Sequence, residues 1–291
     1  MAYGTFLSPA EMFPAGRQDL RVRQLRLASG LAVRIVEAGN EHDPVVLLVP
    51  GWGCSTYIHR DTIAPVAAAG YHAVAVDLKG HGLSDKPTDS AEYTLESMSH
   101  HLVEIIDALE CGPAHLVGHS MGGVIAALAA KGAQHKVRSL VLVSPVGFAG
   151  VPGMRFLRLA TPVSLLPIIR RITTHAMIRL LLGFVYGKRR DATDRDAEEF
   201  RAPVQFPEFI LAMRHLLHRI DWSTTFPKLS TPFMTILGTE DILSPDSDAD
   251  IFRGPRGDNP VHILKGVGHV VFDEAPEIAN PLMTAFFSGA R

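Results

Sequence analysis

The sequence predicts an α/β fold with a mostly parallel, eight-stranded sheet flanked by helices. Short apolar runs rich in β-branched residues alternate with longer segments of helical periodicity, which is typical of strands connected by helical crossovers. Residues 21–27 alternate polar and apolar side chains and therefore predict an edge strand, antiparallel to its neighbour. The chain has 291 residues and 47% hydrophobic content, enough for one large core with a smaller insertion.

The elements can be assigned in order along the chain. The other seven strands are expected at 31–37, 45–49, 73–77, 114–117, 140–143, 233–237 and 261–264. Core helices are expected at 58–69, 95–109, 121–131, 247–252 and 276–287.

One segment breaks this alternation. Residues 148–222 contain no good strand, only helical periodicity interrupted by five prolines. A structureless loop of this length inside a compact fold would be improbable. We therefore predict a helical cap at 148–222, inserted after the sixth strand, and a core formed by 1–147 and 223–291.

Composition narrows the classes of function. The chain has 28 basic and 30 acidic residues, so it lacks the basic excess typical of nucleic-acid binders. Two cysteines, Cys54 and Cys111, make no disulfide framework. We see neither a signal peptide nor the roughly 20 apolar residues of a membrane helix, and expect a soluble, cytoplasmic protein.

A candidate nucleophile lies in the run Gly118-His-Ser-Met-Gly122, a G-x-S-x-G pattern. An apolar strand precedes it and an alanine-rich helix follows it, which is the context this pattern needs. A sharp strand-to-helix turn would lift the hydroxyl of Ser120 above the sheet edge. The helix N-terminus would direct its free N–H groups at a developing oxyanion.

Serine needs a neighbouring base, and the chain offers 14 histidines. His269 stands out because it follows the last strand, on the side of the sheet where the nucleophile lies. The acid should follow the preceding strand, where Asp241 lies three residues after Gly238. Glu240 and Asp246 are its competitors. The order Ser120, Asp241, His269 is that of α/β serine hydrolases.

Four motifs together make the chain resemble the α/β-hydrolase superfamily, in its capped, esterase-like or lipase-like branch. They are Pro50-Gly-Trp-Gly53, residues 77–84, residues 118–123, and 238–241 with Gly268-His269. The resemblance covers roughly residues 21–287. It implies an oxyanion hole formed by the backbone N–H groups of Trp52 and Met121.

We place the substrate pocket around these groups and assign to it Gly51, Cys54, His119, Phe148, Phe184 and Val270. The chain departs from the family at Pro50, where many relatives carry a histidine that braces the loop. Proline removes a donor and stiffens the backbone instead. We expect Cys54 to be a packing residue and not a nucleophile, because no second histidine stands out to activate it.

The predicted reaction is hydrolysis of carboxylic esters of apolar acyl compounds through an acyl-enzyme intermediate. The same triad could serve an acyl-carrier or other thioester, a lactone, or C–C cleavage, and a non-catalytic ligand-binding protein is the alternative of another class. Epoxide hydrolases and haloalkane dehalogenases of this superfamily use an aspartate where this chain has Ser120, so we set those activities aside. No cofactor is predicted.

The cap is unusually basic. Residues 151–190 hold eight basic residues and no acidic one, interleaved with Leu, Ile and Phe. Polar positions near Arg171, His175 and Arg179 recur every four residues and predict one amphipathic helix. The simpler interpretation is a solvated face over an apolar pocket, with the acidic stretch 191–199 neutralising some charges. The alternative is contact with phospholipid headgroups or an acyl carrier.

Two cap histidines, His215 and His218, share a predicted helix face. No carboxylate or cysteine completes a ligand set with them, so we predict no metal site.

Overall fold

The computed structural model describes residues 6–151, 153–254 and 259–290. It has an eight-stranded sheet in the order β1-β2-β4-β3-β5-β6-β7-β8, which confirms the predicted fold class. The strands are β1 (Arg21–Arg26), β2 (Ala32–Ala38), β3 (Val45–Val49), β4 (His72–Val76), β5 (Ala114–His119), β6 (Val137–Val143), β7 (Phe233–Gly238) and β8 (Val261–Leu264).

Strand β2 pairs antiparallel with both β1 and β4, and every other pairing is parallel. The carboxyl ends of β3 to β8 therefore meet at one edge of the sheet. Strands β3 and β4 are buried along their whole length, as expected of parallel strands covered on both faces.

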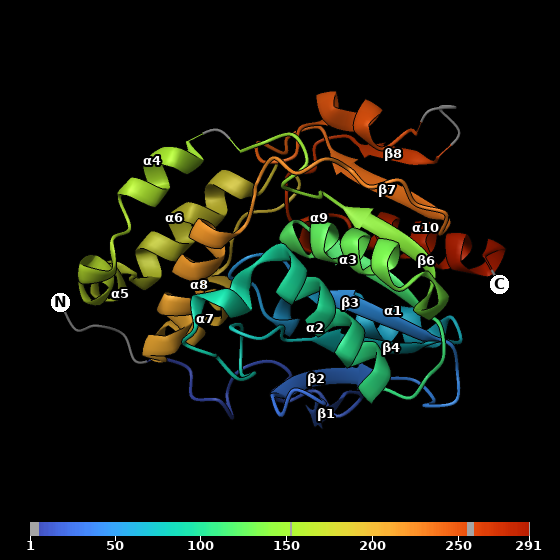
Figure 1. Cartoon of the computed structure of the whole chain (residues 1–291), viewed down its shortest axis with the longest axis horizontal. Helices are drawn as coiled ribbons and strands as arrows, with labels where there is room; N and C mark the ends of the chain where they lie inside the picture. Colours follow the sequence, from blue (N-terminus) through green and yellow to red (C-terminus); the bar gives the residue numbers. More distant parts are fainter. Residues whose placement is uncertain (1–5, 152, 255–258, 291) are drawn as a thin grey trace.

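Helices cover both faces of the sheet (Figure 1). Helices α2 and α3 pack on one face, where the core includes Met98, Leu102 and Ile125. Helices α1 and α10 pack on the other, with Ile63, Met283 and Phe287. The bounds of these helices are α1 (Ile63–Ala68), α2 (Leu95–Ala108), α3 (Met121–Gly132), α9 (Val271–Glu274) and α10 (Pro276–Gly289).

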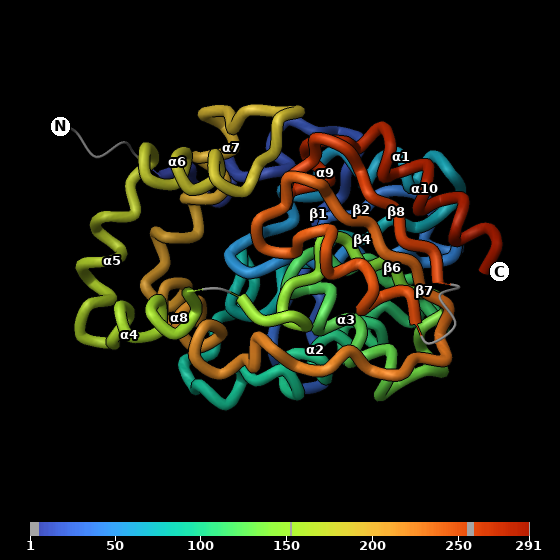
Figure 2. The backbone as a smooth tube through the Cα atoms, turned by 90° about the horizontal axis from the view of Figure 1, so that it is seen from above, coloured from blue at the N-terminus to red at the C-terminus, as the bar shows by residue number. Residues whose placement is uncertain are grey.

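All elements that the described residues form between β6 and β7 are helical. We call them the cap helices: α4 (Met154–Leu159), α5 (Leu166–Ile172), α6 (His175–Val185), α7 (Asp194–Arg201) and α8 (Pro207–Arg219), with the 3-10 turns η4 (Val163–Leu165) and η5 (Ala202–Gln205). They form one end of the molecule, and α4, α5 and α6 lie farthest from α10 at the opposite end (Figures 1 and 2).

Three predicted helices differ from the structure. The helix expected at 58–69 is a 3-10 turn, η1 (Thr56–His59), followed by the short α1. The helix expected at 247–252 is another 3-10 turn, η6 (Asp246–Ile251). The single basic helix expected through Arg171 and Arg179 is wrong. Helix α5 ends at Ile172 and α6 begins after Thr174, whose hydroxyl accepts a hydrogen bond from the Met177 N–H.

Where the structure is described, it contains no helix with both the length and the apolar character needed to cross a membrane.

Candidate active site

Ser120 lies at the turn between β5 and α3, with φ 54° and ψ −124°. This backbone conformation is uncommon for a residue with a side chain, and such strain is concentrated at functional sites. The turn is tight because α3 packs closely on the end of β3. A Cβ on Gly122 would lie 2.5 Å from the Pro50 carbonyl oxygen, so only glycine fits there.

The loop after β3 lies directly against the nucleophile candidate. A Cβ on Gly51 would come within 2.8 Å of the Ser120 Cβ, so the backbone of this loop passes close to the Ser120 side chain. The indole Nε1 of Trp52 donates a hydrogen bond to the Met213 carbonyl in cap helix α8 at 3.1 Å. Met121 is the first residue of α3, where an α-helix leaves its N–H groups without intrahelical partners. The structure thus places the loop before Trp52 against Ser120, and Met121 immediately after it.

A buried carboxylate orients the histidine. The Nδ1 atom of His269 lies 2.9 Å from Oδ2 and 3.1 Å from Oδ1 of Asp241. Oδ1 also accepts hydrogen bonds from the backbone N–H groups of Leu243 and Ser244. Burial alone would raise the pKa of Asp241. His269 and the two backbone N–H donors together have a larger, opposite effect, so the pKa of Asp241 lies below its usual value. Asp241 is therefore charged at neutral pH and fixes the proton of His269 on Nδ1.

The two competing acids lie elsewhere. Glu240 forms an exposed ion pair with Lys188, and Asp246 begins the turn η6. The structure brings neither of them to the His269 ring.

His119 connects the nucleophile turn to the histidine loop. Its Nε2 donates a hydrogen bond to the His269 carbonyl at 2.9 Å, and the two rings are 4.9 Å apart. Because His119 precedes Ser120, this contact ties the turn that carries Ser120 to the loop that carries His269. Burial lowers the pKa of His119 to about 3, so it is neutral at physiological pH. We assigned His119 to the pocket, whereas the structure gives it a bracing role behind the site.

Glu274 holds the same loop from the other side and was not predicted. Its carboxylate accepts hydrogen bonds from the backbone N–H groups of Gly268 and Gly187. The His269 N–H donates to the Val185 carbonyl at 2.7 Å. The end of cap helix α6 therefore packs directly on the histidine loop.

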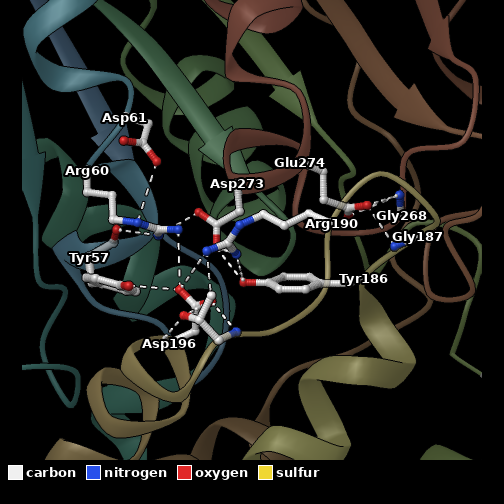
Figure 3. A network of polar contacts seen from close by, with 11 residues as sticks. Tyr57, Arg60, Asp61, Tyr186, Gly187, Arg190, Asp196, Gly268, Asp273 and Glu274 are labelled. Carbon is white, nitrogen blue, oxygen red and sulfur yellow. Dashed lines mark hydrogen bonds and ion pairs between the residues drawn. The ribbon is translucent and has the colours of Figure 1, made fainter.

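A buried polar network extends from this contact (Figure 3). We call it the cap clamp. It consists of two arginines, two aspartates and two tyrosines: Tyr57, Arg60 and Asp273 from the core, and Tyr186, Arg190 and Asp196 from the cap.

The charges of the cap clamp are matched across the boundary between core and cap. Arg60 lies 2.7 Å from Asp273 and 3.3 Å from Asp196, and Arg190 lies 2.8 Å from Asp196. The hydroxyl of Tyr186 donates to Asp273 at 2.5 Å. Both aspartate side chains are fully buried, which is tolerable only because each has charged and hydrogen-bonding partners. Nothing in the sequence pattern indicated this network, since Arg60 and Asp273 are 213 residues apart.

The remaining predicted pocket residues are placed differently. Cys54 and Val270 pack with Leu182 and Tyr186, in an apolar cluster between core and cap. Burial raises the pKa of Cys54 to about 12, which agrees with a packing role. Phe148 stacks edge-on against Phe226 and Phe252. Phe184 is 61% exposed on the outer side of α6, so it does not line an enclosed pocket.

Among the residues described, no group of three or more His, Cys, Asp or Glu side chains could hold a metal ion. His215 hydrogen-bonds to the Thr88 carbonyl, and His218 to the Thr161 hydroxyl.

Comparison with known proteins gives the family. A model described as "Alpha/beta hydrolase family" matches residues 46–280, more than half of the chain. The dihydrolipoyllysine-residue acetyltransferase component of the acetoin cleaving system of Pseudomonas putida is 28% identical over 269 residues, covering 88% of this chain and 67% of that protein. Lipase 1 of Psychrobacter immobilis is 35% identical over 145 residues, but the match covers only 48% of this chain and 44% of the lipase.

Solved structures agree. The crystal structure of a membrane phospholipase A, described as a bacterial virulence factor, superposes with a TM-score of 0.78 at 26% identity, covering 94% of this chain and 87% of that one. Epoxide hydrolases are also among the similar proteins. These relatives support hydrolase activity, and the chain belongs to the α/β-hydrolase family.

Proposed function

We propose that the protein hydrolyses carboxylic esters of apolar acyl compounds, with Ser120 as nucleophile, His269 as base and Asp241 as orienting acid. The observation that carries this proposal is the buried Asp241–His269 hydrogen bond, linked through His119 to a strained serine at a helix N-terminus. This arrangement has the parts that acyl transfer requires.

The chemistry follows from the atoms already placed. With its Nδ1 proton held by Asp241, His269 has a free lone pair on Nε2 and takes the proton of the Ser120 hydroxyl. The serine oxygen attacks the ester carbonyl, and the backbone N–H groups of Trp52 and Met121 stabilise the oxyanion. His269 then protonates the departing alcohol. Water, deprotonated by His269, releases the acid and restores Ser120.

An apolar acyl group is favoured by the contact between core and cap. Cys54 and Val270, each close in sequence to a proposed catalytic group, pack with Leu182 and, more peripherally, Ile178 of α6. A lipase among the relatives supports the same substrate class. A serine at the nucleophile position disfavours epoxide opening, which in this superfamily uses an aspartate.

Replacing Ser120 by alanine tests the proposal. We expect turnover of p-nitrophenyl butyrate to fall about 10⁴-fold or more, with unchanged folding, because the residual rate comes only from binding and the oxyanion groups. A fluorophosphonate probe should label the wild type and not Ser120→Ala. Ser288→Ala on α10 is the matched control and should keep full activity.

Three outcomes are distinguishable. Activity retained in Ser120→Ala would contradict the nucleophile. Labelling of Ser120 without cleavage of p-nitrophenyl esters from C2 to C16 would contradict the ester substrate and leave the nucleophile standing. A folded wild type that neither reacts nor is labelled would favour a binding protein.

A further inference from the structure

The outer surface of the cap is apolar where a surface helix is usually polar. Ten of the fourteen large hydrophobic side chains exposed in the described residues lie between Phe156 and Phe184. Leu159 is 82% exposed and Phe156 75%. Exposed apolar residues scattered singly are normal, but a concentrated set marks an interaction site. The ten are Phe156, Leu157, Leu159, Val163, Leu165, Ile168, Ile172, Leu180, Leu181 and Phe184.

These residues belong to α4, η4, α5 and α6, which follow one another along the chain. Both views place these helices together at the end of the molecule away from α10 (Figures 1 and 2). We call this surface the apolar cap face.

Arginine side chains bind two of these helices to the rest of the cap. The guanidinium of Arg158 on α4 donates to the carbonyls of Leu217 and Ile220, at and after the end of α8. Arg170 on α5 donates to the carbonyls of Val204 and Gln205 in η5. No residue of α4 or α5 is buried, and Leu182 alone is buried in α6. Helices α4 and α5 therefore lack the fully buried apolar stripe that a surface helix usually turns toward the core.

The apolar cap face is also strongly basic. Residues 154–185 contain five arginines and no aspartate or glutamate. Arg158 and Arg170 bind neutral carbonyls, so their charge is not cancelled. Arg179 pairs with Asp194, but both side chains are more than half exposed, and such a pair is largely screened. By contrast, Lys188, Arg189 and Arg190, which follow α6, each pair with a carboxylate.

We propose that the apolar cap face docks the protein onto an anionic lipid surface. Leu, Ile and Phe side chains would enter the boundary between headgroups and acyl chains, and the arginines would remain at the lipid phosphates. A second copy of the chain fits less well, because a twofold interface would set five arginines of one subunit against five of the other. The proposal goes beyond ester hydrolysis and does not depend on it.

Vesicle binding tests the proposal directly. We expect the wild type to sediment with vesicles of phosphatidylglycerol and phosphatidylcholine at low salt. Binding to pure phosphatidylcholine should be at least tenfold weaker, and 1 M NaCl should weaken binding to anionic vesicles. A variant with Phe156, Leu159, Leu180 and Phe184 changed to serine should bind anionic vesicles at least tenfold more weakly.

A matched control removes exposed apolar groups elsewhere. Val22→Ser with Ile263→Ser changes exposed residues of β1 and β8 and should leave vesicle binding unchanged. Ser120→Ala should also bind normally, so a failure of the proposed activity is separable from a failure of docking. Circular dichroism and thermal unfolding of the four-serine variant would show that it remains folded.

The following results would overturn the proposal. One is equal binding to anionic and neutral vesicles. Another is no binding to either, with a dimer in sedimentation that the four-serine variant converts to monomer. A third is binding to an acidic acyl-carrier protein, through the same four residues, without binding to vesicles.

Discussion

The two sides of the cap differ in what they bury and what they expose. On the side that meets the histidine loop, buried charges are matched one against another in the cap clamp. On the far side, α4, α5 and α6 leave most of their large apolar side chains in solvent, and Arg158 and Arg170 bind backbone carbonyls.

This difference indicates which side positions the site and which side meets a partner. Buried, fully paired charges are sensitive to geometry, so they fix the cap relative to His269. Exposed apolar groups do not fix the cap relative to His269, and they lower solubility. A concentrated set of them therefore indicates a surface that binds a partner. The cap is therefore held at one edge and exposed at the other.

Breaking the cap clamp should have the largest effect. In Asp273→Asn, Arg60 and Arg190 lose a buried counter-charge 2.7 Å and 3.6 Å away. Removal of one partner from a buried ion pair typically costs about 3–5 kcal/mol, and we expect this loss in the free energy of unfolding. Urea unfolding followed by circular dichroism measures it. Because α9 follows His269 directly, ester turnover should also fall.

The matched control is Asp194→Asn, which makes the same chemical change in the exposed pair with Arg179. A surface pair of this kind contributes about 0–1 kcal/mol, so the control should unfold nearly as the wild type does. Equal unfolding free energies for the two variants would mean that the cap clamp does not fix the cap.

Sequence patterns predicted the sheet well because each strand carries its own signal. The runs 45–49 and 261–264 match β3 and β8 residue for residue. The Asp241–His269 contact was predictable because the family fixes the chain order of these residues, and parallel strands bring their carboxyl ends together.

The failures have different causes. The helix expected at 58–69 is broken between η1 and α1, where Arg60 reaches residues more than 130 positions away in the cap clamp. The break between α5 and α6 had a local signal in Thr174, a typical N-cap residue, that periodicity alone outweighed. Phe184 was assigned to the pocket from composition, which cannot distinguish the inner side of a helix from the outer.

We expect the smallest effects from replacing two threonines that are N-cap residues of cap helices. One lies beside the cap clamp and the other at the start of α6. Thr193 caps α7, and its hydroxyl and backbone N–H both donate to Asp196, a member of the cap clamp. Thr174 caps α6 through one hydrogen bond, from the Met177 N–H. Loss of a capping side chain costs about 0.5–2 kcal/mol. We expect the loss in the free energy of unfolding to be near the upper limit for Thr193→Ala and near the lower limit for Thr174→Ala, as measured by urea unfolding.

Amide hydrogen exchange shows where in the chain Thr174→Ala and Thr193→Ala each weaken the structure. Thr174→Ala should speed exchange in the first turn of α6 and leave the backbone near Asp273 unchanged, because the Thr174 hydroxyl bonds to the Met177 N–H and not to a residue of the cap clamp. Thr193→Ala should speed exchange at both α7 and α9. Without the Thr193 hydroxyl, Asp196 is held less firmly, and the contacts of Arg60 with Asp196 and Asp273 should weaken. Thr→Ser at each position keeps the hydroxyl and should restore protection. Equal, local effects from both alanine variants would contradict the difference between the two sides, because they would show that the cap clamp transmits nothing from the cap to the histidine loop.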